Sequence, residues 1–208
     1  MKLTLVRHGQ TDWNTCKRVQ GRTDTSLNER GVLQAKAAAE YFVGKGIGAV
    51  YCAPLMRARH TAQAIAARAG IENIRVLDGL TEINFGAWEG KTDKELIAEF
   101  PGHWGDWNWV LDARLCREIG AESADEILAR AISCIERIKD ENPPDAHIAI
   151  VSHTMPIKLL TAHYIGLPLS RIRHIRIDNC ASSVLKLHED GGATLLCWND
   201  TSYLGGLL

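Results

Sequence analysis

Short apolar runs, each followed by a longer stretch with helical periodicity, alternate along this chain. The run over residues 3–6 is typical of a buried strand, because it is short, continuous and rich in branched side chains. Similar runs recur, and Ala-rich or amphipathic stretches separate them. The pattern predicts strands at residues 2–7, 49–52, 74–77, 147–151, 181–188 and 193–198, with helices beginning near residues 27, 55, 93, 124 and 155.

Polar and glycine residues mark the ends of several predicted helices. Ser26 and Ser123 each begin a Ser-x-x-Glu sequence, which has the spacing of a helix capping box. Thr92 opens a short helix that Pro101 closes, and Gly70 stops the helix over 55–69. These signals fix where the helical segments start and end.

Strands that alternate with helices predict an α/β fold. We expect three α-β-α layers around a mostly parallel, mixed central sheet. A length of 208 residues is enough for one sizeable core. The sequence therefore predicts a single domain over residues 1–208, with a small cap insertion built mainly from residues 86–120.

Composition and charge exclude several classes of partner. Lys and Arg number 24 against 25 Asp and Glu, so no overall basic field favours nucleic acid. No apolar segment approaches membrane-spanning length, and no secretory signal is present. The six cysteines form no Cys-x-x-Cys pair, which favours reduced thiols in a cytoplasmic protein. The oligomeric state stays open, a homodimer included.

Three predicted strands lead into basic residues instead of ordinary turns. The first ends in Arg7 and His8, the second leads to Arg57 at the start of a helix, and the fourth ends at His153. The carboxyl ends of parallel strands share one edge, so we expect these side chains to converge there with helix N-terminal amides. Such a set suits a phosphate dianion.

A histidine beside two arginines favours covalent chemistry over simple phosphate binding. A neutral His8 imidazole can attack phosphorus in line, while the neighbouring cations stabilise the equatorial oxygens. The departing alkoxide also needs a proton. Glu82, which lies between a predicted strand and a Gly-rich turn, is the best-placed carboxylate, and a nearby phosphate would raise its pKa.

Five sequence blocks, in order, resemble those of the histidine phosphatase superfamily, in its phosphoglycerate-mutase-like branch and its small bacterial-type phosphatases. The blocks are Arg7-His8-Gly9-Gln10-Thr11 with Asn14, Gln20-Gly21 with Asp24 and residues 27–31, Pro54-Leu55-x-Arg57-Ala58-x-x-Thr61-Ala62, residues 82–90, and Ser152-His153. Each block alone is a weak signal, but five in the family's order are specific. A family-like Asn199-Asp200-Thr201 follows near the end.

The resemblance implies a phosphoric monoester hydrolase with an Arg-His-Gly motif. His8 would be the phosphorylated nucleophile and Glu82 the proton donor. It implies no metal and no cofactor. The residues that it assigns to holding the phosphoryl group or the substrate are Arg7, Asn14, Gln20, Gly21, Arg57, Glu82, His153 and Thr154.

Two departures from the family pattern concern the fit of the substrate. The family usually has glycine at the position of Thr154, and serine at one or both of the positions of Cys52 and Ala53. None of these changes removes a catalytic group. If Cys52 lay beside the phosphate, its thiol would be a target for oxidative inhibition.

Hydrolysis of a small phosphorylated metabolite is the function we favour, and a cofactor-dependent phosphoglycerate mutase is the runner-up. Mutases of this family have a longer and more basic insertion before the second histidine, because they hold a doubly phosphorylated intermediate. An inactive phospho-ligand binding module would be expected to lack His8 or Glu82. A zinc-dependent hydrolase would lose its activity to a chelator. The arginines between Glu82 and His153 are Arg114, Arg117, Arg130 and Arg137.

The substrate itself stays open among sugar phosphates, phosphoglycerates, nucleotides, phosphoserine and ribazole phosphate. Trp104, Trp107 and Trp109 lie in the predicted cap. They either wall the leaving-group side of the pocket, which we slightly favour, or pack as core under a long loop.

Overall fold

The computed structural model describes residues 1–102 and 110–208. Within these residues one six-stranded sheet has the order β3-β2-β4-β1-β5-β6. β1, β2, β3 and β4 are parallel, and β5 is antiparallel to both β1 and β6. The predicted α/β fold with a mostly parallel mixed sheet is therefore confirmed. The strands are β1 (Lys2–Arg7), β2 (Ala49–Cys52), β3 (Ile74–Val76), β4 (His147–Ser152), β5 (Ser182–Leu187) and β6 (Ala193–Asp200).

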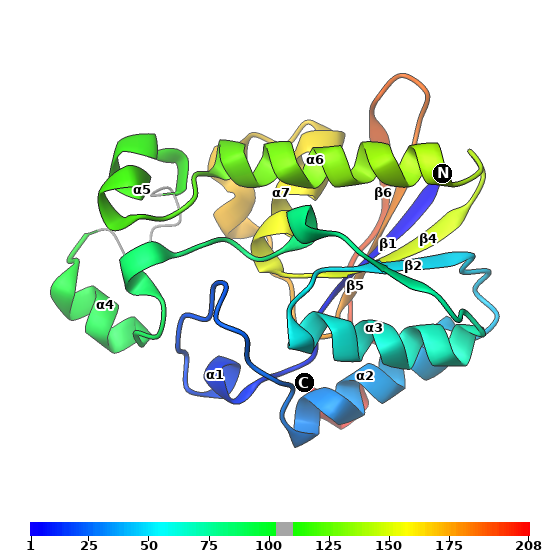
Figure 1. Ribbon diagram of the computed structural model, residues 1–208, viewed down its shortest axis with the longest axis horizontal. Coiled ribbons are helices and arrows are strands. Elements are labelled where there is room, and N and C mark those ends of the chain that lie inside the picture. The colour runs from blue at the N-terminus through cyan, green and yellow to red at the C-terminus, as the bar shows by residue number, and fades with distance from the viewer. Residues whose placement is uncertain (103–109) are drawn as a thin grey trace.

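Helices cover both faces of the sheet (Figure 1). α2 (Glu29–Phe42) and α3 (Met56–Ala69) lie on one face, and α6 (Ala124–Glu141) and α7 (Thr154–Ile165) lie on the other. None of the helices in the described ranges is both long and apolar enough to cross a membrane. The shorter elements are α1 (Asp12–Thr15), α4 (Asp93–Glu99) and α5 (Ala113–Ile119), with the 3-10 helices η1 (Asp78–Leu80), η2 (Gly86–Trp88), η4 (Leu169–His174) and η5 (Gly205–Leu207).

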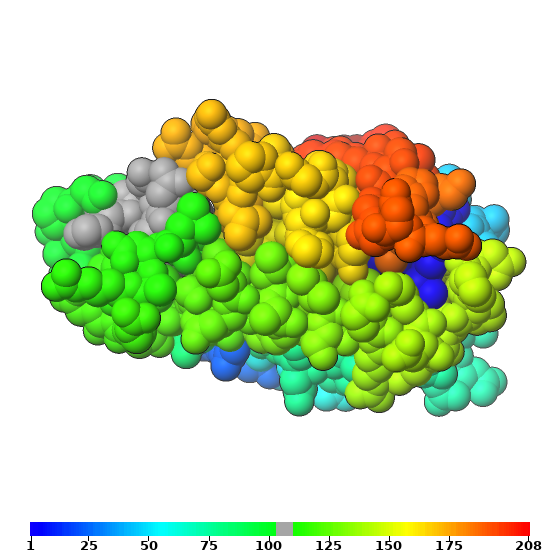
Figure 2. Space-filling model, turned by 90° about the horizontal axis from the view of Figure 1, so that it is seen from above, coloured from blue at the N-terminus to red at the C-terminus, as the bar shows by residue number. Residues whose placement is uncertain are grey.

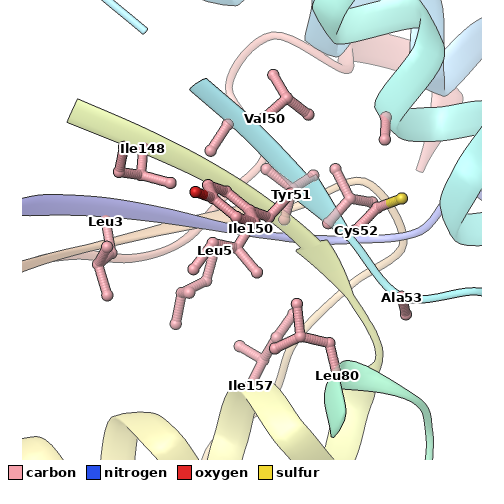
Figure 3. Packing of buried hydrophobic residues seen from close by; sticks show 14 of the residues in the cluster. Leu3, Leu5, Val50, Tyr51, Cys52, Ala53, Leu80, Ile148, Ile150 and Ile157 are labelled. Atoms are coloured by element: carbon pink, nitrogen blue, oxygen red, sulfur yellow. The ribbon is translucent and has the colours of Figure 1, made fainter. Parts of the chain in front are cut away.

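The main core lies between the sheet and its helices. Leu3 and Leu5 of β1 point to the same side as Ile157 of α7, whereas Val50 points to the other side (Figure 3). This arrangement follows from the two-residue period of a strand, which sends alternate side chains to opposite faces. All four residues are at most 1% exposed. Burial on both faces explains why the sequence shows continuous apolar runs rather than strict alternation.

A second apolar cluster joins the segment between η2 and α5 to the helices above the sheet. Trp88 and Leu96 are fully buried there against Ile127 of α6 and Met155 of α7. Figure 2 shows this green segment gathered at one end of the molecule, beside α6. The expectation for Trp104, Trp107 and Trp109 concerns residues outside the described ranges.

The predicted helix starts are confirmed with one exception. Ser123 and Thr92 both form capping boxes. The capping box predicted at Ser26 is wrong, because the cap of α2 is Asn28, whose side chain accepts from the amide of Gly31 at 2.9 Å. The Asn28 amide itself donates to Gln10 at 3.0 Å, so the chain stays extended until that residue.

Candidate active site

The pairing of β1 with β4 brings the two predicted histidines together. Arg7 lies opposite Ser152 in this parallel pair, so the next residue of each strand also lies side by side. His8 donates its amide to the Ser152 carbonyl at 3.0 Å. The ring centroids of His8 and His153 are 5.1 Å apart. Strand register, rather than any long-range side-chain contact, sets this distance.

Two arginines flank the histidine pair, and both are anchored by main-chain carbonyls. Arg57, near the start of α3, is fully buried and donates to Gly21 at 2.7 Å and Thr23 at 2.8 Å. Arg7 donates to Ile177 at 2.8 Å. Burial lowers the pKa of both guanidinium groups, while the nearby Glu82 carboxylate opposes this shift. Arginine remains a cation even so, which leaves fixed positive charge beside His8.

The tautomer of His8 follows from its single ring hydrogen bond. Its Nδ1 lies 2.7 Å from the Gly9 carbonyl, which can only accept, so Nδ1 must donate. Burial, followed by the charges of Arg57 and Arg7, holds the pKa of His8 well below its usual 6.5. The ring is therefore neutral at physiological pH, and its lone pair lies on Nε2.

His153 is fully buried beside His8, and burial and Arg57 likewise hold its pKa well below 6.5. Neither of its ring nitrogens has a hydrogen-bond partner among the described residues. A neutral imidazole offers one N–H donor and one acceptor, so this side chain keeps a donor available beside His8.

The Glu82 carboxylate is held by three backbone amides. Oε1 accepts from Ile83 at 3.1 Å and Met155 at 3.0 Å, and Oε2 accepts from Thr154 at 3.1 Å. The amides at the start of α7 were expected to face a phosphate, and in this structure they hold the carboxylate. Burial raises the pKa of Glu82, against the opposing effect of these hydrogen bonds and of the two arginines.

Asn14 presents a donor to the site because its oxygen is already occupied. Asn14 Oδ1 accepts from the Thr11 amide at 3.1 Å and from Asn179 Nδ2 at 3.2 Å. A backbone amide can only donate, which fixes the orientation of the carboxamide and leaves Nδ2 for the pocket. Gln20 Oε1 accepts from the Thr25 hydroxyl at 2.6 Å in a similar arrangement.

A side chain does not fit at Gly21. Its φ of +50° is unfavourable for other residues, and a Cβ there would lie 2.0 Å from Glu89 Oε1. Glu89 in turn accepts from the amides of Arg22, Thr23 and Phe85 at 2.9 to 3.1 Å. The close approach keeps the Gly21 carbonyl within reach of Arg57.

These residues surround a pocket of about 300 Å³. It is lined by eight of the residues predicted from the sequence, whereas His153, which is fully buried next to His8, does not line it. The predicted residues that line it are Arg7, His8, Asn14, Gln20, Gly21, Arg57, Glu82 and Thr154. Lining residues that the sequence reasoning missed include Trp13, Lys17, Arg18, Phe85, Asp93 and Met155.

The missed residues carry little signal in the sequence. Lys17, Arg18 and Phe85 lie outside helices and strands, where no hydrophobic period indicates which side chains turn inward, and the other three lie in the first turns of helices. The adjacent cations Lys17 and Arg18 were the only visible hint. Asn179, which donates to the His8 carbonyl at 3.0 Å, precedes a strand and resembles an ordinary turn residue in sequence.

Cys52 takes no part in the pocket. It is fully buried at the end of β2, and burial raises the pKa of its thiol to about 11. A thiol that stays protonated is a poor nucleophile, so the suggestion that Cys52 is an oxidation target beside the phosphate is wrong.

Arg130 of α6 clamps the loop that carries Glu82. Its guanidinium donates to the carbonyls of Gly79, Thr81 and Glu82 at 2.7, 2.5 and 3.1 Å. It also donates twice to the Glu122 carboxylate, at 3.0 Å each. Three of these hydrogen bonds hold the backbone of residues 79–82, which carries the general-acid candidate Glu82, and the other two hold Arg130 itself against Glu122.

We expect Arg130→Met to lower the free energy of unfolding by about 2 kcal/mol or more, because it removes a shared donor from three partly buried carbonyls and two hydrogen bonds from the Glu122 carboxylate. Arg137→Met on the same helix is the matched control. Arg137 is exposed and has one ion pair, to Glu141, so its loss should cost less than about 0.5 kcal/mol. Urea unfolding of both variants measures the difference, and equal effects would contradict a clamp at Arg130.

Fold and geometry together define a class of protein: an α/β enzyme with an anion pocket at the carboxyl edge of its sheet, where a neutral imidazole lies between two arginines. The model of the histidine phosphatase superfamily (branch 1) matches residues 3–201. The chain belongs to this superfamily, which confirms the resemblance found in its motifs and the prediction of a phosphatase-class enzyme.

Relatives within the superfamily carry several names. The chain is 31% identical to phosphoserine phosphatase 1 of Hydrogenobacter thermophilus, over 99% of this chain and 95% of that protein. It is also 31% identical to a probable phosphoglycerate mutase GpmB of Photorhabdus laumondii, over 88% of this chain and 83% of the relative. Mycobacterial relatives at 35% identity are longer, and the chain spans 55% of their length.

Among solved structures, a mycobacterial glucosyl-3-phosphoglycerate phosphatase in complex with VO3 superposes with a TM-score of 0.85. Its sequence is 30% identical, and the match covers 96% of this chain and 99% of that one. The predicted three-layer fold and this solved fold are thus the same.

Proposed function

We propose that this protein hydrolyses a small phosphomonoester by transferring its phosphoryl group to His8 and then to water. One observation carries the proposal: a neutral imidazole, fixed by its Nδ1 hydrogen bond to Gly9, lines a pocket between the cations of Arg7 and Arg57. A phosphate clamp alone would gain nothing from an imidazole kept neutral by its surroundings.

In the first step, the Nε2 lone pair of His8 attacks phosphorus while the ester P–O bond breaks. The proton of the neutral Glu82 carboxyl group passes to the departing alkoxide, which leaves as an alcohol. Arg7 and Arg57 stabilise charge on the equatorial oxygens, and the Asn14 amino group donates alongside them. The Gly9 carbonyl stabilises the positive charge that develops on the imidazole, through its hydrogen bond from Nδ1.

In the second step, water attacks phosphorus opposite the P–N bond. The Glu82 carboxylate accepts a proton from this water, and the P–N bond breaks to return the lone pair to Nε2 of His8. Inorganic phosphate is released and both groups regain their starting protonation states. The raised pKa of Glu82 supports this double role as acid and base.

The relatives support a phosphorylated small molecule as substrate. Phosphoserine, phosphoglycerate and glucosyl-3-phosphoglycerate, which appear in their names, are all phosphomonoesters that contain a carboxylate. The VO3 of the similar mycobacterial structure is a chemical analogue of a phosphoryl group. We propose a substrate of this size, which a pocket of about 300 Å³ can accommodate.

Phosphoglycerate mutase activity is the alternative. Four arginines follow Glu82 before His153, and none of them lines the described pocket. Arg130 clamps the Glu82 loop and Arg137 pairs with Glu141, while Arg114 and Arg117 lie exposed on α5. These arginines therefore add no positive charge to the lining for a second phosphate. Their positions support hydrolysis rather than a mutase reaction, which must hold a doubly phosphorylated intermediate.

A cytoplasmic location and independence from metal, nucleic acid and membrane complete the proposal. All six cysteines are free thiols, which supports a reducing compartment. The catalytic steps use only groups of this chain, and we assign substrate specificity to the segment over residues 86–120, from which Asp93 lines the pocket.

A phosphate-release screen over small phosphomonoesters tests the proposal. We expect release that EDTA does not inhibit and that His8→Ala abolishes. The panel includes 3-phosphoglycerate with and without 2,3-bisphosphoglycerate. Isomerisation of phosphoglycerate without net phosphate release would instead establish a mutase, and inhibition by EDTA that zinc reverses would overturn the metal-independent mechanism.

A further inference from the structure

The pocket has two halves that come from different parts of the chain. The ends of the strands and the start of α3 supply the half that would bind the phosphoryl group, with Arg7, His8 and Arg57. We call this the phosphoryl half. α1 and the segment that follows it supply a second wall, with Trp13, Lys17 and Arg18. Figure 1 places this segment next to α4, and a bridge between Arg18 and Thr92 joins the two. The second half faces the space into which the alcohol part of a substrate must extend.

Lys17 is the cation of this wall whose charge is uncommitted. It is exposed, and among residues 1–102 and 110–208 no hydrogen bond, ion pair or ring contact involves its side chain. Arg18, by contrast, donates to the Gly90 carbonyl, and its guanidinium carbon lies 5.7 Å from the centroid of the Trp13 ring. One cation of the pair is thus fixed in place and the other is available to a ligand.

The backbone of Lys17 is held in a conformation that a lysine rarely adopts. Its φ is +52°, in the left-handed region. Hydrogen bonds on both sides maintain it: the Lys17 amide donates to Asn14 at 3.3 Å, and its carbonyl accepts from Asp93 at 3.1 Å. Glycine would adopt this conformation without strain, so lysine at this position suggests a use for its side chain.

The charges around Lys17 still leave the wall attractive to anions. Asp93 is the acidic residue of this half, and it lies in the first turn of α4, where the helix dipole compensates a carboxylate. Arg18 contributes a second positive charge next to Lys17. The phosphoryl half already has its own cations, so Lys17 can act on a different group, with the fixed charge of Arg18 beside it.

We propose that Lys17, supported by Arg18, recognises an acidic group on the alcohol part of the substrate. The preferred substrates are then phosphomonoesters that carry a carboxylate or a second phosphate a few bonds from the reacting phosphorus. This inference rests on the proposed phosphatase function and assigns its substrate class. Lys17 acts in binding and discrimination, and it takes no part in the transfer steps.

The test compares substrates that differ in one group. Glycerol 3-phosphate replaces the carboxylate of 3-phosphoglycerate with a hydroxymethyl group, and O-phosphoethanolamine lacks the carboxylate of O-phosphoserine. We expect the wild type to have the higher kcat/KM for the acidic member of each pair. Lys17→Met should reduce this preference by about tenfold, the effect of losing one charge-assisted hydrogen bond, and Lys17→Arg should retain most of it.

Controls separate this inference from the proposed function. Lys36→Met removes the same charge from an exposed site on α2 and should leave both preferences unchanged. Glycerol 1,3-bisphosphate distinguishes the two acidic groups: faster turnover than 3-phosphoglycerate would assign a second phosphate, and slower turnover a carboxylate. A preference that survives in Lys17→Met overturns the inference while His8-dependent phosphate release stands. Absence of any such release overturns the function itself.

Discussion

His8→Ala is expected to lower phosphate release by about 10⁴-fold or more, since it removes the only imidazole among the described residues that line the pocket. Wild-type protein quenched in alkali during turnover should carry phosphate on His8, because phosphohistidine survives alkali and is lost in acid. The phosphorus should be bonded to Nε2, because Nδ1 is committed to the Gly9 carbonyl. Rapid-quench labelling and phosphorus NMR check these outcomes.

His60→Ala is the matched control for His8. His60 is exposed on α3, so its removal should change neither activity nor labelling. Circular dichroism and thermal unfolding must show that His8→Ala retains the fold. Labelled protein in His8→Ala, or wild-type labelling that resists acid, would place the intermediate on another residue or on a carboxylate.

Glu82→Gln should have the next largest effect, and the effect should depend on the leaving group. The variant cannot supply a proton, so we expect kcat/KM for alkyl phosphates, which reports transfer to His8, to fall by about 10² to 10⁴-fold. p-Nitrophenyl phosphate needs little protonation, and its kcat/KM should fall by less than about tenfold, although the shared hydrolysis step can lower kcat for both substrates. Steady-state kinetics on both substrates measures the difference.

The pH profile gives a second measure of the same group. Burial raises the pKa of Glu82 above its usual 4.5, so the protonated acid persists to higher pH in the folded enzyme. Activity on alkyl phosphates should therefore decline as pH rises through this pKa, and the decline should be absent in Glu82→Gln. Glu72→Gln, at an exposed position, is the control. Equal losses in kcat/KM on both types of leaving group would rule out Glu82 as the acid.

The sequence predicted the strand ends well because their signal is local. A buried run that ends in Arg7 and His8 is visible without any knowledge of contacts, and parallel strands must bring such ends to one edge. Most helix boundaries were also readable from their caps. The exception, Asn28, depends on a hydrogen bond to Gln10 that no local pattern reveals.

The supports of the site could not be predicted in this way. Arg130 lies on a helix where its charge looked ordinary, yet it binds carbonyls of residues 79–82 that are distant in sequence. Lys17 and Asn179 act from irregular segments. Their positions depend on how loops meet in three dimensions, and hydrophobic periodicity does not encode that information.

The three amides that hold Glu82 determine which side chains near the pocket can change without displacing this carboxylate. They belong to the main chain at residues 83, 154 and 155, so no side chain at these positions is needed to place the acid. Thr154 stands where the family usually has glycine, and it still donates its amide to the carboxylate. Mutational drift at position 154 can thus remodel the pocket wall while proton delivery is preserved, which makes it a position where new substrate ranges can evolve at little catalytic risk.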